Sequence, residues 1–156
     1  MTGRIVQVNV SPGGLPKLPV PEARVGALGL EGDGHRNLEH HGGPERALCL
    51  FSLEQIRALR AEGHDIAPGV IGENVTVEGL DWERVTPGAR LRLGAEVLIE
   101  ITRYTAPCLN IRAVFADGDI TRVSQKRRPG WSRVYARVLE AGTVRPGDPV
   151  SLLDPA

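Results

Sequence analysis

Two cysteines and a histidine-containing loop are the parts of this sequence best suited to chemistry. Cys108 follows a proline in a polar stretch with Arg103 and Arg112 nearby, whereas Cys49 lies in the apolar run 47–51. Positive charge favours the thiolate, the form of cysteine that attacks electrophiles and binds soft metals. The pattern leaves open whether Cys108 is functional or an ordinary loop thiol. We expect it to be solvent-accessible, and we expect Cys49 to be a buried, inert side chain.

The segment 26–46 holds six glycines and three histidines and has no sustained hydrophobic period. A loop of this length inside a compact domain is typically functional. His41, Gly42 and Gly43, followed by Arg46, suggest an anion cradle, because glycines expose backbone N–H groups and the arginine adds charge. Two alternatives remain: hydrogen-bonded histidines that organise the loop, and a structural zinc site. The zinc site is less favoured, since adjacent histidines cannot easily point at one ion.

The remaining elements must position these residues. Ser52 and Gln55 form a capping box before a helix predicted over 52–62, with Gly63 as its stop. Residues 109–115 could form one or two helical turns. Alternating or short apolar runs bounded by glycine and proline predict strands over 4–10, 22–25, 47–51, 73–77, 90–93, 97–102, 132–139 and 150–153. The sequence therefore predicts a mainly β fold, most economically an antiparallel β-barrel with a few short helices.

Size and composition fit one domain spanning 1–156, with 41% hydrophobic and 24% charged residues. The formal net charge is zero, which argues against general nucleic-acid binding. No apolar run is long enough to span a membrane and no signal core is present, so a cytoplasmic location is expected. Residues 103–137 nevertheless carry 8 Lys/Arg against 2 Asp/Glu, a balance of +6. This segment is either a solvated basic face or a wall for an anionic ligand.

Several short blocks occur in an order typical of one protein family. They are Gly32-Asp33, His41-Gly42-Gly43-Pro44-Glu45-Arg46-Ala47, Ile71-Gly72-Glu73-Asn74-Val75-Thr76-Val77-Glu78-Gly79-Leu80, Pro107-Cys108, Arg137-Val138-Leu139, Gly142 and Gly147-Asp148. The set resembles a stand-alone MOSC domain, the module also found at the C-terminus of molybdenum cofactor sulfurases. It is particularly similar to bacterial proteins that reduce N-hydroxylated purines, and the likeness covers residues 4 to 152.

The resemblance implies a MOSC-type antiparallel β-barrel that binds the molybdenum cofactor (molybdopterin). It implies Cys108 as the molybdenum ligand and catalytic residue, or as the site of a persulfide in sulfur-transfer members. A thiolate suits molybdenum as a soft ligand, and arginine suits the pterin's phosphate. Glu73 is either a proton donor or a carboxylate that bonds loop backbone. The cofactor-binding residues implied are His41, Gly42, Gly43, Arg46, Glu73, Asn74 and Arg103.

Three functions follow from the resemblance and the residues. The first is a molybdenum-dependent reductase of N-hydroxylated compounds, whose electrons come from a separate protein. The second is a sulfur carrier whose Cys108 persulfide is supplied by a cysteine desulfurase and passed to a cofactor-assembly enzyme. The third is a non-catalytic module that binds an anion or a pterin. Related large sulfurases carry a pyridoxal phosphate domain, which this sequence lacks. The reductase-like bacterial members carry a further C-terminal helical segment, so the reducing partner is expected to be missing or different here.

Overall fold

The structure is a computed structural model that describes residues 2–34 and 43–153. Strands dominate it, which confirms the predicted mainly β class. The strands are β1 (Thr2–Val10), β2 (Leu18–Val20), β3 (Ala23–Gly26), β4 (Gly29–Leu30), β5 (Leu48–Ser52), β6 (Val75–Glu78), β7 (Arg90–Leu93), β8 (Val97–Tyr104), β9 (Val134–Glu140), β10 (Gly142–Val144) and β11 (Pro149–Leu152). The helices are α1 (Leu53–Ala61) and the short 3₁₀ helices η1 (Pro44–Arg46), η2 (Trp82–Arg84), η3 (Leu109–Val114) and η4 (Ile120–Val123).

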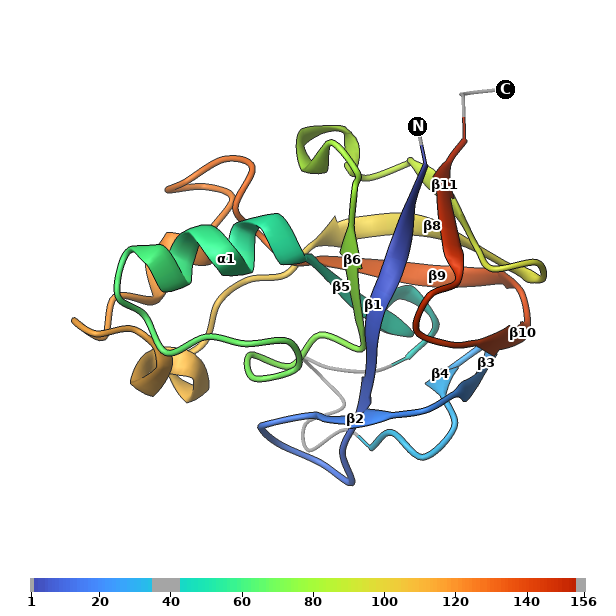
Figure 1. Ribbon diagram of the computed structural model, residues 1–156, viewed down its shortest axis with the longest axis horizontal. Helices are drawn as coiled ribbons and strands as arrows, with labels where there is room; N and C mark the ends of the chain where they lie inside the picture. The colour runs from blue at the N-terminus through green and yellow to red at the C-terminus, as the bar shows by residue number, and fades with distance from the viewer. Residues whose placement is uncertain (1, 35–42, 154–156) are drawn as a thin grey trace.

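The main sheet closes on itself into a barrel. Its strand order is β11-β7-β8-β9-β5-β6-β1-β2, and β1 also pairs with β11, with Thr2 opposite Ser151. Figure 1 shows β1 and β11 side by side. All pairings in the barrel are antiparallel except that between β5 and β6, which are joined through α1. Two parallel strands need a crossover connection of this kind, and α1 provides it. The barrel is therefore antiparallel, as predicted, except at the β5–β6 pair.

Alternating apolar residues build the core. In β8, Val97, Ile99 and Ile101 are buried while the residues between them are partly exposed. Phe51 at the end of β5 meets Trp82 edge to face, with ring centroids 6.1 Å apart. Each fully buried side chain of this size stabilises the fold by about 1.5–3 kcal/mol. The core therefore fixes the strand ends on which the loops rest.

Helix α1 forms where the sequence predicted it. The Ser52 hydroxyl accepts from the Gln55 N–H at 3.4 Å, as an N-cap should. The Gln55 side chain differs from the predicted box, because its oxygen accepts from the Ser52 hydroxyl at 2.5 Å and its amide donates to the Gly130 carbonyl. Gly63 follows the helix with φ of +101°, a left-handed conformation that favours glycine. Among the described residues, no helix is long and apolar enough to span a membrane.

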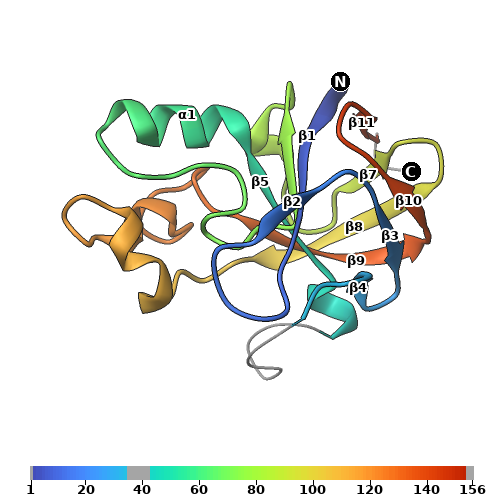
Figure 2. The same cartoon turned by 60° about the horizontal axis from the view of Figure 1, so that its bottom comes forward.

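The connection between β8 and β9 is the longest excursion from the barrel. It contains η3, which matches the helical turns predicted over 109–115, and η4. Together with α1 it occupies one end of the molecule, opposite the small sheet of β3, β4 and β10 (Figures 1 and 2). The sequence did not predict β2, β4 or β10. These strands are two to three residues long and leave almost no periodicity to detect.

Candidate functional site

Three neighbouring strands bring polar residues to one face of the barrel wall. Cys49 in β5 lies opposite Tyr135 in β9, and Tyr135 in turn lies opposite Arg103 in β8. Side chains of directly opposed residues project from the same face of a sheet. The Arg46 guanidinium at the end of η1 lies 5.9 Å from the centroid of the Tyr135 ring. We call Arg46, Cys49, Arg103 and Tyr135 the Tyr135 face.

Cys108 lies next to this face at the start of η3. Its backbone is extended (φ −127°, ψ 164°), and its carbonyl accepts from the Ile111 N–H at 3.2 Å. The thiol is partly exposed, whereas Cys49 is only 6% exposed and contacts the Thr105 hydroxyl at 3.7 Å. The predicted contrast in burial between the two cysteines is confirmed. Burial also raises the pKa of Cys49, which keeps this thiol protonated.

Tyr135 connects the groups of the face, and sequence reasoning missed it. Burial raises the pKa of its phenol to about 12, and the nearby Cys49 and Cys108 thiols add to the effect. Arg133 and Arg46 act in the opposite direction. The phenol therefore stays neutral at physiological pH. The available signal was a tyrosine alternating with Val134 and Ala136 in a strand, and alternation alone does not distinguish a ligand-facing residue from a packed one.

Asn74 holds the strands beneath this face together. Its side-chain oxygen accepts from the Cys49 N–H at 3.0 Å, and its amide donates to Asp33 Oδ2 at 2.8 Å and to the Asn9 carbonyl at 3.3 Å. Both N–H donors are used within the protein, which leaves one lone pair of the oxygen for a ligand. The contact between Asn74 and a pterin therefore stays a prediction, and its role in the structure is to cross-link three segments.

Asp33, from the predicted Gly32-Asp33 block, is part of the same network. Its Oδ1 accepts from Lys17 Nζ at 2.7 Å and from the Ser11 N–H at 3.0 Å. The Asp33 side chain is 2% exposed and that of Lys17 is 10% exposed. A buried ion pair that is fully hydrogen-bonded fixes geometry, even where its net stabilisation is small. The ion pair holds Asp33, which belongs to the 26–46 segment, in position to accept the hydrogen bond from Asn74.

Glu73 is completely buried beside these residues. Its Oε2 accepts from the Thr76 hydroxyl at 3.0 Å, and Oε1 has no hydrogen-bond partner among the described residues. Burial raises the pKa of the carboxyl from 4.5 to about 7, against the opposing effects of the Gly69 and Glu73 backbone, the Thr76 hydroxyl and Arg133. Glu73 can therefore gain or lose a proton near neutral pH. Its predicted contact with a cofactor remains a prediction.

The described end of the 26–46 segment packs on β8 and β9. Gly43 has φ of +82° and precedes η1, and its carbonyl accepts from the Arg46 N–H. The Thr102 hydroxyl donates to the Glu45 carbonyl at 2.6 Å, and Arg137 pairs with the Glu45 carboxylate at 3.3 Å. Glu45 and Arg46 of this segment therefore contact Arg137 and Tyr135 of the region 103–137. His41 and Gly42 lie outside the described residues.

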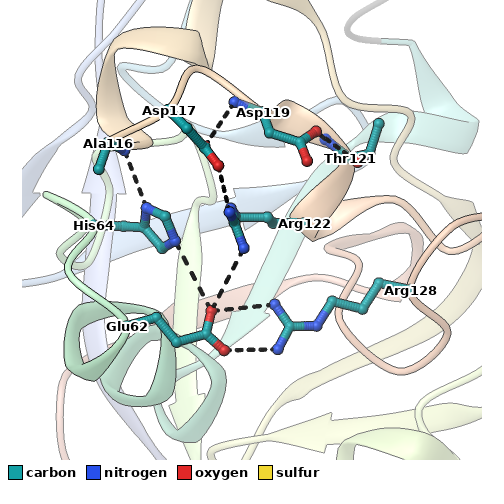
Figure 3. Close-up of polar contacts among 8 residues, drawn as sticks. All are labelled: Glu62, His64, Ala116, Asp117, Asp119, Thr121, Arg122 and Arg128. Atoms are coloured by element: carbon teal, nitrogen blue, oxygen red, sulfur yellow. Dashed lines mark hydrogen bonds and ion pairs between the residues drawn. The ribbon is translucent and has the colours of Figure 1, made fainter.

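A polar network anchors the segment that carries Cys108 to the end of α1 (Figure 3). Arg128 binds the Glu62 carboxylate with both terminal nitrogens, at 2.8 and 3.3 Å, and Arg122 approaches it at 3.9 Å. The His64 Nδ1 accepts from the Ala116 N–H at 3.1 Å. Part of the excess positive charge predicted over 103–137 is therefore neutralised within the protein.

Comparison with known proteins agrees with this fold. The family model of the MOSC domain matches residues 37–151, so the chain belongs to the MOSC domain family. Within the family it is similar to the E. coli (strain K12) protein YiiM, 31% identical over 148 residues, covering 91% of this chain and 64% of YiiM. It is 33% identical over 125 residues to the uncharacterised protein YflK of Bacillus subtilis (strain 168), covering 80% of this chain and 55% of YflK.

A third relative is named as a reductase. This protein of Gibberella moniliformis is 32% identical over 135 residues, covering 82% of this chain and 23% of its own length. The chain thus spans 23% to 64% of these relatives. Among solved structures, YiiM of Geobacillus stearothermophilus superposes with a TM-score of 0.77 at 26% identity, covering 97% of this chain and 75% of that one. YiiM of E. coli gives 0.74 at 27% identity, covering 100% and 71%.

Proposed function

We propose that the protein binds the molybdenum cofactor through Cys108 and reduces N-hydroxylated small molecules. The observation that carries the proposal is the position of Cys108, a partly exposed thiol beside a face that carries Arg46 and Arg103. Membership of the MOSC family and the name of the Gibberella relative support a reductase. The single sulfur donor suits a metal whose other ligands come from a bound pterin.

The residues present fit such a cofactor. Cys108 would supply the thiolate, and Arg46 and Arg103 would supply charge-assisted hydrogen bonds to a phosphate. When bound, the cofactor supplies the electron transfer and the site that receives the substrate oxygen. The neutral Tyr135 phenol would shield the thiolate from bulk water without adding charge. Glu73, with its pKa of about 7, can hold or release a proton near neutral pH close to Cys49.

The stoichiometry of the reduction shows which electrons and protons must be supplied. Conversion of an N–OH group to N–H consumes two electrons and two protons, breaks the N–O bond and releases water. We propose that a separate redox protein provides the electrons at the surface near Cys108. The protons can come from solvent or from groups such as Glu73.

Sulfur transfer is the second candidate, because the partly exposed Cys108 thiolate can attack a persulfide carried by another protein. A cysteine desulfurase carrying a persulfide would transfer its outer sulfur to the Cys108 thiolate, which forms a new S–S bond as the desulfurase thiolate leaves. The Cys108 persulfide would then deliver that sulfur to a cofactor-assembly enzyme. This mechanism needs the same exposure of Cys108, but no molybdenum.

Metal analysis of the Cys108→Ser variant tests the proposal. Protein from a host that makes the cofactor should contain molybdenum, and Cys108→Ser should lose most of it while its stability changes by about 0.5 kcal/mol or less. Cys49→Ala is the matched control and should retain the metal. A gain of one sulfur atom on Cys108 after incubation with a desulfurase, without molybdenum, would favour sulfur transfer. Wild-type protein with neither property would leave the non-catalytic binding module.

A further inference from the structure

His64 is a buried histidine that uses only one of its two ring nitrogens for a hydrogen bond. It follows the end of α1, and its side chain is 3% exposed. Its Nδ1 accepts from the Ala116 N–H at 3.1 Å, and its Nε2 has no hydrogen-bond partner in the part of the chain that the structure describes. A ring nitrogen accepts only when it carries no proton, so this contact requires the neutral ring with its proton on Nε2.

The bond to Ala116 holds the turn that follows η3 against the end of α1. Next to it, the Val114 carbonyl accepts from the Asp65 N–H at 2.8 Å. The Phe115 ring meets the His64 ring edge to face, with centroids 5.3 Å apart. Ala116 itself is exposed, so water can replace the imidazole as the acceptor of its N–H. The bond can therefore open without leaving a buried donor unsatisfied.

Charged side chains lie on the side of the other ring nitrogen. Nε2 is 3.8 Å from a Glu62 carboxylate oxygen, which is too far for a hydrogen bond. The same carboxylate binds Arg128 and lies 3.9 Å from Arg122 (Figure 3). The charged groups on the elements packed around His64 are Glu62, Asp65, Asp117, Arg122 and Arg128. The Glu62 carboxylate favours a proton on the ring, and the two arginines oppose it.

A second proton on the ring reverses both contacts. It must go to Nδ1, where two N–H donors would then face each other, so the bond to Ala116 is lost. The charged ring in turn gains from a closer contact with the Glu62 carboxylate. His64 therefore has two alternative arrangements, a neutral ring bound to Ala116 and a charged ring bound to Glu62. Histidine is the side chain that ordinarily changes charge between pH 5 and 8.

We propose that His64 is a pH-operated latch between the end of α1 and the segment that carries Cys108. With a neutral ring the latch is closed, because the imidazole binds the Ala116 N–H. With a charged ring, in mild acid, His64 turns to Glu62 and releases the turn between η3 and η4. Because η3 begins directly after Cys108, the latch holds the far end of the short helix at whose start the thiol lies. The latch requires neither a cofactor nor a persulfide.

NMR of ¹⁵N-labelled protein between pH 8 and 5 tests the latch. At pH 8 the His64 ring should show the tautomer with its proton on Nε2. As the pH falls, the Ala116 amide signal should move with the same midpoint as the His64 ring signals. The protection of that amide against hydrogen exchange, relative to its intrinsic rate at each pH, should fall about tenfold.

Three variants separate the latch from other titrations. His64→Asn places an amide oxygen near the position of Nδ1 and cannot be protonated, so Ala116 should stay protected at every pH. Glu73 also titrates near pH 7, and His64→Asn leaves that group in place, so the comparison isolates His64. His64→Phe has no acceptor and should leave Ala116 weakly protected throughout. In Glu62→Gln the His64 midpoint should move to lower pH, because the charged ring loses its counter-ion.

Several results would overturn the proposal. One is a wild-type ring that carries its proton on Nδ1 at pH 8, and another is an Ala116 signal that does not follow His64. A pH-dependent loss of protection that persists in His64→Asn would assign the change to another group, and full protection in His64→Phe would show that the bond does not hold the turn. Should His64→Asn fail to fold, the wild-type tautomer and the shared midpoint decide.

Discussion

Replacing Glu73 by glutamine should change how the stability of this protein depends on pH. The folded protein raises the pKa of this carboxyl from 4.5 to about 7, mainly through burial. Below pH 4.5 the carboxyl is neutral in both states and the shift has no effect. Between 4.5 and 7 the unfolded chain releases the proton while the folded protein keeps it, so rising pH destabilises the fold. Above 7 the full penalty is present.

The size of the effect follows from the two pKa values. Each unit of pKa difference corresponds to about 1.4 kcal/mol, so the penalty reaches about 3 kcal/mol above pH 7. Glu73→Gln keeps the shape of the side chain and cannot ionise. The stability of the variant relative to the wild type should therefore increase by about 3 kcal/mol between pH 4.5 and 8. The difference in stability at low pH reflects the altered hydrogen bonds of this side chain, including the bond to Thr76.

Urea unfolding followed by tryptophan fluorescence at a series of pH values measures this difference. Taking the difference between variant and wild type cancels the other groups that titrate in the same range. Glu31→Gln, at an exposed position, is the control and should show no such trend. A constant difference between Glu73→Gln and the wild type from pH 4.5 to 8 would refute the argument, because it would mean that burial does not hold the carboxyl neutral.

Three further predictions concern the site and its anchoring. Alkylation of the native protein should label Cys108 before Cys49, as peptide mass spectrometry would show, and faster labelling of Cys49 would contradict the burial contrast. Glu62→Gln should weaken the contacts of Arg128 and speed amide exchange in 105–131 but not in the barrel strands; uniform acceleration would count against a local anchor. The ultraviolet difference spectrum between wild type and Tyr135→Phe should show phenolate only as the pH approaches 12; its appearance near 10 would contradict the burial of the phenol.

Strong local signals made most of the fold predictable. The Ser52 cap, the helical spacing after it and Gly63 together located α1 to within a residue. Alternation located the long strands such as β8. The parallel pairing of β5 and β6 was not predictable, because the direction of a strand leaves no mark in its own sequence. It follows from the crossover through α1, which is a property of the tertiary fold.

The sequence predicted which residue types form the candidate site, but not which of these side chains are buried. The flanking residues of Cys108 predicted its exposure, which the structure confirms, whereas its role as a metal ligand was implied only by the family resemblance. Asn74 donates both N–H groups within the protein, to Asp33 Oδ2 and to the Asn9 carbonyl, and its contact with a ligand stays a prediction. Arg133 went unnoticed, since one arginine in a basic stretch resembles its neighbours. Only the structure shows that it is the buried one.

The excursion 105–133 leaves the barrel from Tyr104 and returns at Val134, and these two residues lie opposite each other in adjacent strands. The ends of the excursion are thus held together by the β8–β9 ladder whatever lies between them. Lengthening such a closed loop costs little, about 0.6 kcal/mol for each doubling. Insertions and substitutions there can accumulate without disturbing strand register, while Cys108 stays near the barrel wall. The residues around the Cys108 thiol can therefore diversify during evolution while the barrel stays the same.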